Sequence, residues 1–321
     1  MKPALIDVPV ALIFFNRPDT LEKVFDVIKE VKPNQLFLIQ DGAREKRDDD
    51  VEKIFECRKI VENIDWDCEV YRDYSETNLG CGMRVYSGIT NAFQKVDRLI
   101  ILEDDILANR SFFSFCKELL EKYKDDERIN MISGMNHLEQ YSSNDESYFF
   151  SKNGSIWGWA TWKRVWGKVD YNMEFAKDKK IMDLIYNVIP NKYVAKKLVQ
   201  NGTEKREQLN SGENLTAWSY QFGMTMYLNS QLIIVPKYNL TSNIGITADS
   251  THATDSLKKM PKSIQRVFFM KTIEMDFPLT HPNHVIDDVI FTQKIEKIMG
   301  SNKVSIFIRR VEGKLRRLLY R

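Results

Sequence analysis

The sequence has few residues of the kinds that build disulfide frameworks, metal knuckles and membrane spans. Its 321 residues include four cysteines, with no C-x-x-C pair, and four histidines. A disulfide framework or zinc knuckle is therefore not expected, and a reducing, cytoplasmic compartment is the simpler interpretation. No run approaches the roughly 18 apolar residues of a membrane span. Asp7 and Pro9 interrupt the apolar N-terminus, which favours a buried strand over a signal peptide.

The sequence also has no excess of positive or negative charge. Lys and Arg number 47 against 45 Asp and Glu, a net charge of +2, which excludes nucleic-acid binding driven by overall charge. Neither G-x-G-x-x-G nor G-x-x-x-x-G-K-[ST] occurs, so a dinucleotide-dependent dehydrogenase and a P-loop enzyme are poorly supported. Hydrophobic residues reach 43%, enough for a substantial core.

The first half alternates short apolar runs with helical patterns. Apolar spacing predicts helices over residues 21–31, 51–61 and 85–96, and Asp19 with Glu22 suggests a capping box for the first. Such alternation predicts an α/β fold with a mostly parallel sheet flanked by helices. The expected buried strands cover residues 10–15, 36–39, 68–71 and 99–102.

Polar groups follow three of these strands where each one ends. They are Asn16-Arg17, Asp41 and Glu103-Asp104-Asp105. Ligands bind at the carboxyl ends of parallel strands, so we expect these groups to converge on one crevice. Three adjacent carboxylates repel one another unless a cation compensates, and a hard divalent ion bridging to a diphosphate does so. The alternative is a solvated acidic turn, which is our interpretation of Asp48-Asp49-Asp50.

Several segments, taken in their order along the chain, resemble those of a known enzyme family. FFNRPDTLEKV, QDG, NLGCGMRVYSGI and LIILEDD together resemble a nucleotide-sugar-dependent glycosyltransferase of the GT-A (Rossmann-like) fold. ILEDD resembles the acidic DXD-type motif of N-acetylglucosaminyltransferase I. GSIWGWATWKRVW and NLTSNIG…THAT resemble a bacterial group of glycosyltransferases of surface polysaccharide synthesis. The resemblance covers roughly residues 8–255.

The resemblance implies roles for single residues. Arg17 is expected to contact the nucleotide, and Asp41 to accept a hydrogen bond from its base, commonly uracil. Glu103 is expected near the ribose and Asp104 near the donor sugar. Asp105 is expected to bind Mn²⁺ or Mg²⁺, which offsets the charge of the departing diphosphate.

Other candidates have structural alternatives of similar weight. Arg84 is expected to reach the diphosphate or to be a solvated helix residue. Trp157 and Trp159 are left open as acceptor-site walls, whereas the helical spacing of Trp159, Trp162 and Trp166 favours core for the last two. His252 is either a further metal or phosphate ligand or a surface residue.

The catalytic base is the least defined part of the prediction. Transfer with inversion needs a base beside the acceptor hydroxyl. Related enzymes carry an acid beside a tryptophan at a helix start, but here that stretch reads Thr216-Ala217-Trp218-Ser219. Glu213 is our substitute, and its alternative role is to stabilise a helix dipole.

The predicted organisation is a catalytic domain at residues 1–255, with a nucleotide-binding half (1–135) and an acceptor-binding half (136–255). A helical extension (256–321) follows. Residues 301–321 carry seven basic residues and one acidic residue, a net +6, together with apolar residues at helical spacing. This tail predicts either peripheral docking of residues 303–321 on the inner face of an anionic membrane or a terminal helix packed on the catalytic domain.

The predicted function is metal-dependent transfer of a sugar from a nucleotide diphosphate, UDP by resemblance, to a glycan or lipid-linked acceptor in bacterial polysaccharide synthesis. Two alternatives stay open. One is a sugar-nucleotide nucleotidyltransferase, a class that normally has a glycine-rich loop after its first strand, where this chain has Asn16-Arg17-Pro18. The other is a non-catalytic carbohydrate-binding or sugar-nucleotide-binding protein on the same fold.

Overall fold

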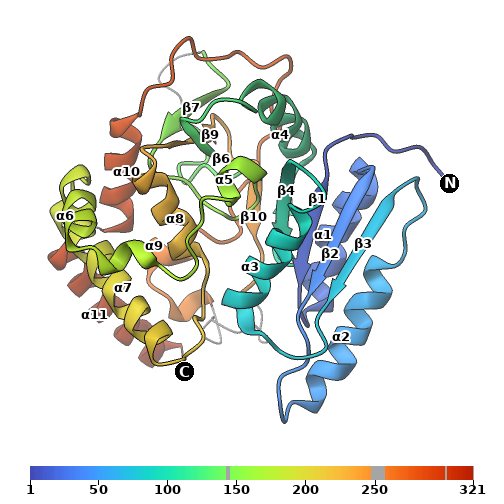
Figure 1. Cartoon of the computed structure of the whole chain (residues 1–321), viewed down its shortest axis with the longest axis horizontal. Coiled ribbons are helices and arrows are strands. Elements are labelled where there is room, and N and C mark those ends of the chain that lie inside the picture. Colours follow the sequence, from blue (N-terminus) through green and yellow to red (C-terminus); the bar gives the residue numbers. More distant parts are fainter. Residues whose placement is uncertain (142–144, 247–256, 301, 321) are drawn as a thin grey trace.

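A computed structural model of the chain describes residues 1–141, 145–246, 257–300 and 302–320. Its centre is an eight-stranded sheet in the order β3-β2-β1-β4-β8-β6-β9-β7, beside a two-stranded sheet of β10 and β5 (Figure 1). The strands are β1 (Val10–Phe14), β2 (Gln35–Gln40), β3 (Glu69–Tyr74), β4 (Arg98–Glu103), β5 (Ile106–Ala108), β6 (Ile129–Ser133), β7 (Tyr148–Ser151), β8 (Trp159–Trp162), β9 (Leu232–Pro236) and β10 (Thr241–Asn243).

Helices flank the sheet and continue past its last strand. In the order of the chain they are α1 (Pro18–Val31), α2 (Asp48–Val61), α3 (Gly80–Ala92), α4 (Arg110–Lys122), α5 (Lys163–Trp166), α6 (Lys179–Val188), α7 (Lys192–Asn210), α8 (Ser219–Leu228), α9 (Lys262–Gln265), α10 (Val289–Met299) and α11 (Lys303–Leu319), with short 3₁₀ turns at Glu174–Lys177 and Leu257–Lys259.

The first half is the parallel α/β unit that the sequence predicts. β1 pairs in parallel with β2 and β4, and β2 pairs in parallel with β3. β1 is buried along its whole length, as expected for a strand covered on both faces. The predicted Rossmann-like fold class is confirmed.

One local prediction in this half is wrong. Asp19 does not cap α1: the helix begins at Pro18, and Arg17 occupies the cap position without a side-chain cap bond. Pro suits the first helical position because its missing N–H has no partner there in any case. The helix predicted over 51–61 is present as α2, whose buried apolar residues are Ile54, Cys57 and Val61, whereas Val51 and Phe55 are 61% and 59% exposed.

The second half adds antiparallel strands to the same sheet. β8 runs antiparallel to both β4 and β6. Trp159 and Trp162 therefore belong to a strand, which corrects the predicted helical face, although Trp162 and Trp166 are buried as expected. Further along, α6 ends before Pro190 and α7 begins after it, so this proline separates two helices.

One large core joins the two halves. It includes the strands of the first half and Phe291 and Ile295 of α10. From the second half it includes the aromatic residues Trp159, Trp162, Trp166, Trp218 and Phe222. A smaller core lies between α6, α7 and α8. Across the described residues, we find no helix with the length and apolar character needed to cross a bilayer.

Candidate active site

The acidic cluster, defined as Glu103-Asp104-Asp105, lies where β4 ends. β1 is the neighbouring strand, with Ile13 opposite Glu103, so the turn after β1 meets the cluster. The backbone N–H of Phe15 donates a hydrogen bond to Asp104 Oδ2 at 3.0 Å. The expected convergence of these two strand ends is present.

Arg17 connects the cluster to the turn after β1. Its Nη1 lies 2.9 Å from Asp105 Oδ2, and its Nη2 pairs with Asp104 Oδ1. The Arg17, Asp104 and Asp105 side chains are only 18%, 3% and 13% exposed. Two carboxylates thus converge on one positive charge in a partly desolvated setting, where charge-assisted hydrogen bonds are strong.

The protonation of the cluster reflects this crowding. Burial, together with the charges of Asp105 and Asp104, raises the pKa of Glu103 to about 8. Burial also raises the pKa of Asp104, to about 6, although the Arg17 charge opposes the shift. Raised pKa values mean that the site disfavours further negative charge, and a cation bound there would lower them by favouring the ionised carboxylates.

A segment far along the chain covers Asp105. β10 pairs antiparallel with β5, placing Asn243 opposite Ile106. The N–H of Ile244 donates to the Asp105 carbonyl at 2.9 Å. Gly245 is packed so closely that a Cβ there would collide with Asp105 Oδ2. Apart from the glycine itself, no local pattern in the sequence indicates this contact.

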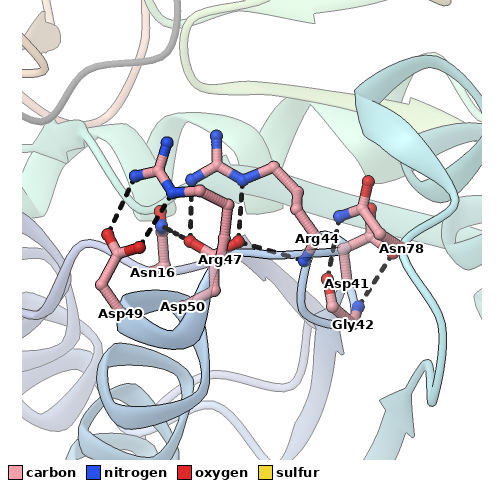
Figure 2. A network of polar contacts seen from close by, with 8 residues as sticks. All are labelled: Asn16, Asp41, Gly42, Arg44, Arg47, Asp49, Asp50 and Asn78. Carbon is pink, nitrogen blue, oxygen red and sulfur yellow. Dashed lines mark hydrogen bonds and ion pairs between the residues drawn. The ribbon is translucent and has the colours of Figure 1, made fainter.

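Asp41 follows β2, but its carboxylate is already fully engaged. Its oxygens accept hydrogen bonds from the N–H of Gly42 at 2.9 Å and from Asn78 Nδ2 at 3.2 Å (Figure 2). They also accept from the N–H groups of Leu79 and Gly80, at 2.8 and 2.9 Å. Burial raises the pKa of Asp41, and the backbone donors oppose that rise. A carboxylate offers about four lone-pair positions. In this structure none is left for a nucleotide base, and Asp41 instead organises the start of α3.

The start of α3 borders the acidic cluster. Partial burial, followed by the charges of Glu103 and Asp41, raises the pKa of the Cys81 thiol in its first turn to about 11. Gly80 and Gly82 shape this turn: Gly80 has a φ of +76°, and a Cβ on Gly82 would strike the Leu215 carbonyl. The Cys81 thiol thus lies within range of the charges at the ends of both β4 and β2.

A buried ion pair beside the crevice was missed by the sequence analysis. Asp50 is fully buried and accepts hydrogen bonds from Arg44 Nε and Nη2 and from Asn16 Nδ2, all at 2.7 Å (Figure 2). Arg44 also stacks over the Phe15 ring, 5.4 Å from its centroid. The interpretation of Asp48-Asp49-Asp50 as a solvated turn is thus wrong for Asp50, which ties α2 to the turn after β1.

Arg84 is engaged away from the predicted diphosphate position. Its Nη2 lies 2.6 Å from Asp73 Oδ1 and 2.7 Å from the Asp73 carbonyl. The residue is only 4% exposed, so it is not a solvated helix residue either. Among the described residues, its Nε finds no hydrogen-bond partner. In this structure Arg84 joins α3 to β3.

The two tryptophans proposed as acceptor walls differ in accessibility. Trp159 is completely buried and packs on Trp218 and Phe222, with ring centroids at 5.6 and 4.7 Å. It belongs to the core and presents no surface to an acceptor here. Trp157 is half-buried and lies 5.2 Å from the Phe268 ring, so its role as a wall stays a prediction.

Two further candidates are placed only in part. Glu213 is exposed in the turn after α7, two residues before Leu215, whose carbonyl touches Gly82. The segment that carries it therefore reaches the first turn of α3. His252 lies outside the described residues.

Within the described chain, the best candidates for metal ligands are Asp104 and Asp105, the two carboxylates that pair with Arg17. No group of three His, Cys, Asp or Glu side chains within the described ranges is arranged to hold a metal ion. Mg²⁺ commonly takes one or two carboxylates and completes its shell with substrate phosphates and water. Asp104 and Asp105 fit such a partial site, since both already converge on a cationic group.

Comparisons with known proteins give weak likenesses. No family model and no curated protein matches the chain. Among solved structures, it resembles 4-diphosphocytidyl-2C-methyl-D-erythritol synthase from Anaerococcus prevotii at 10% identity, over 73% of this chain and 91% of that one, with a TM-score of 0.32. It also resembles an apo UDP-glucose pyrophosphorylase at 8% identity, over 74% and 93%, with a TM-score of 0.38. Likenesses at this level assign neither a family nor a reaction.

Proposed function

We propose that this chain is an enzyme that acts on a nucleoside-diphosphate sugar with the help of Mn²⁺ or Mg²⁺. The observation that carries the proposal is the pair Asp104 and Asp105, whose carboxylates converge on the Arg17 cation at the carboxyl end of β4. In open parallel sheets this edge is where ligands bind. A groove of about 780 Å³ that Pro9 and Arg98 help to line lies at the opposite end of β4 and is not part of the proposal.

The chain's own residues position the donor in this proposal. Asp105, with Asp104, would hold the cation, which when bound offsets negative charge on a departing diphosphate. Phe15 N–H and Arg17 orient Asp104. Because Arg17 is part of the site's charge balance, we assign it the contact with the anionic part of the nucleotide.

The reaction we propose first is glycosyl transfer to a hydroxyl of a glycan or lipid-linked acceptor, on a GT-A type of site. Inversion requires a base that removes the acceptor proton. Glu213 is the carboxylate we propose, because the segment that carries it reaches the first turn of α3, beside the crevice. A Glu213→Gln variant is expected to lose about 10²-fold or more in transfer rate while retaining donor binding. Transfer at the wild-type rate would remove Glu213 from the proposal.

The second candidate is nucleotidyl transfer, which makes the sugar nucleotide and releases pyrophosphate. It stays open because a parallel-sheet core of this kind also suits that reaction, and fold does not fix function. The turn after β1 is a point against it: α1 begins at Pro18, four residues beyond the end of β1, and the intervening Phe15-Asn16-Arg17 contains no glycine.

The products distinguish the candidates. The full chain would be incubated with Mn²⁺ and nucleotide sugars, with and without glycan acceptors, and separately with sugar phosphates and nucleoside triphosphates. Release of nucleoside diphosphate supports glycosyl transfer, whereas pyrophosphate supports nucleotidyl transfer. Metal-dependent nucleotide binding without either product would identify a non-catalytic binding protein.

A further inference from the structure

The C-terminal helix α11 packs against the rest of the chain through its polar side. Gly313, its one buried residue among those described, lies against Pro261. Glu312 accepts a hydrogen bond from the N–H of Lys262 at 3.0 Å, and Arg316 Nη1 donates to the Lys258 carbonyl at 3.3 Å. Since residues 309, 312, 313 and 316 share one side of a helix with 3.6 residues per turn, this side faces the protein.

The apolar side of α11 faces outward. Its seven side chains are between 40% and 76% exposed. At 3.6 residues per turn they form one continuous stripe, about 120° wide. Contiguous exposed apolar surface of this kind marks an interaction site. The alternative in which the stripe packs on the catalytic domain is therefore wrong. The stripe consists of Val304, Phe307, Ile308, Val311, Leu315, Leu318 and Leu319.

Basic residues border this stripe on its free edge. Lys303, Arg310, Lys314 and Arg317 are all exposed and lie on the flank away from the packed side. Within the described ranges, none of these four forms an ion pair. Residues 301–321 carry a net +6, whereas the rest of the chain carries a net −4. The positive charge is thus gathered beside the exposed stripe, at the edge of the molecule opposite β3 and α2 (Figure 1).

We propose that α11 docks the protein on an anionic lipid bilayer. The apolar stripe enters the boundary between headgroups and acyl chains, and the flanking bases contact lipid phosphates, as in interfacial amphipathic helices. The charge beside the stripe favours an anionic bilayer over a second copy of the chain as the binding partner. Pairing two such stripes would bring two sets of like charges together, while an anionic surface complements them.

Sedimentation of the full chain with vesicles tests this proposal. We expect it to pellet with vesicles of phosphatidylglycerol and phosphatidylcholine at low salt, less at high salt, and far less with phosphatidylcholine alone. Removing two flanking charges in Arg310→Gln/Lys314→Gln should weaken binding about 30-fold, or about fivefold per charge. Phe307→Ser/Leu315→Ser should abolish it. Because all four side chains are exposed, these variants should fold.

A matched control removes exposed apolar surface elsewhere. Val51→Ser/Phe55→Ser on α2, with side chains of comparable exposure, should bind vesicles like the wild type. The proposal is overturned if the full chain does not pellet with anionic vesicles, if it binds neutral vesicles equally, or if Phe307→Ser/Leu315→Ser leaves binding unchanged. The proposal is also overturned if the wild type forms a concentration-dependent dimer and Phe307→Ser/Leu315→Ser is monomeric, because the stripe would then bind a second copy of the chain.

Discussion

The carboxylate of Asp105 owes its position to three neighbours that are distant in the sequence. Arg17 approaches from the turn after β1, Ile244 N–H holds the Asp105 carbonyl, and Gly245 leaves the space that the carboxylate fills. The acidic motif itself was predictable, because three carboxylates after an apolar strand are unusual. The approach of Arg17 was predictable as well, because both groups follow neighbouring parallel strands. The contacts of Ile244 and Gly245 were not, since nothing in local spacing pairs residues 105 and 245.

Gly245→Ala should impair the proposed metal site without removing a charge. The new Cβ would collide with Asp105 Oδ2, so the carboxylate must move. We expect Mn²⁺-dependent nucleotide affinity, measured by calorimetry, to fall about tenfold or more. Gly223→Ala is the matched control: nothing lies within 4 Å of its added Cβ, and it sits within α8. It should leave affinity unchanged, and equal affinity in both variants would refute the role of Gly245.

Asp50→Asn should change the acid stability of the protein. The hydrogen bonds from Arg44 lower the pKa of Asp50 below its usual value, so its stabilising contribution is present above about pH 4 and is lost as pH falls through the lowered folded-state pKa. We expect Asp50→Asn to cost about 2 kcal/mol at pH 7, and this difference to shrink below pH 4, in urea unfolding. Exposed Asp49→Asn serves as control. A pH-independent difference would contradict the account.

Helices and strands were predictable where burial leaves a clear pattern. The buried strands β1, β2 and β4 are continuous apolar runs, and their positions were predicted to within a few residues. The tryptophans of β8 were misplaced because spacings of three and four also fit a helix, and only pairing with β4 and β6 fixes the strand. The hydrogen bonds of Asp41 were not predictable for a similar reason: its backbone donors at Leu79 and Gly80 come from a different segment.

Asp41→Ala tests whether this residue organises α3 or selects the base. One buried and two partly buried backbone N–H groups would lose their acceptor, so we expect a loss of about 2 kcal/mol in unfolding free energy. Relative affinities for uridine and other nucleoside diphosphates should stay the same. Asp178→Ala removes an exposed N-cap from α6 and should cost less. Unchanged stability with lost base preference would restore the base-binding role.

In the whole molecule, an acidic site and a basic helix lie in different places. The acidic cluster lies at the carboxyl ends of the parallel strands, and the basic helix α11 lies beyond the last strand of the sheet (Figure 1). The parallel half and the tail were predictable from local patterns, namely buried runs and a terminal excess of basic residues. The outward direction of the α11 stripe was not, because it depends on which side meets Pro261 and Lys262.

The central claim is that Asp105 holds a divalent cation that is required for nucleotide binding. Thermal unfolding with nucleoside diphosphates, with and without Mn²⁺, measures this directly, because a ligand that binds the native state raises its apparent stability. The matched control is Asp97→Asn, at the other end of β4, whose side chain is 93% exposed. We predict that the wild type and Asp97→Asn gain several degrees only when Mn²⁺ and nucleotide are both present, and that folded Asp105→Asn gains none. An undiminished Mn²⁺-dependent shift in Asp105→Asn would contradict the claim.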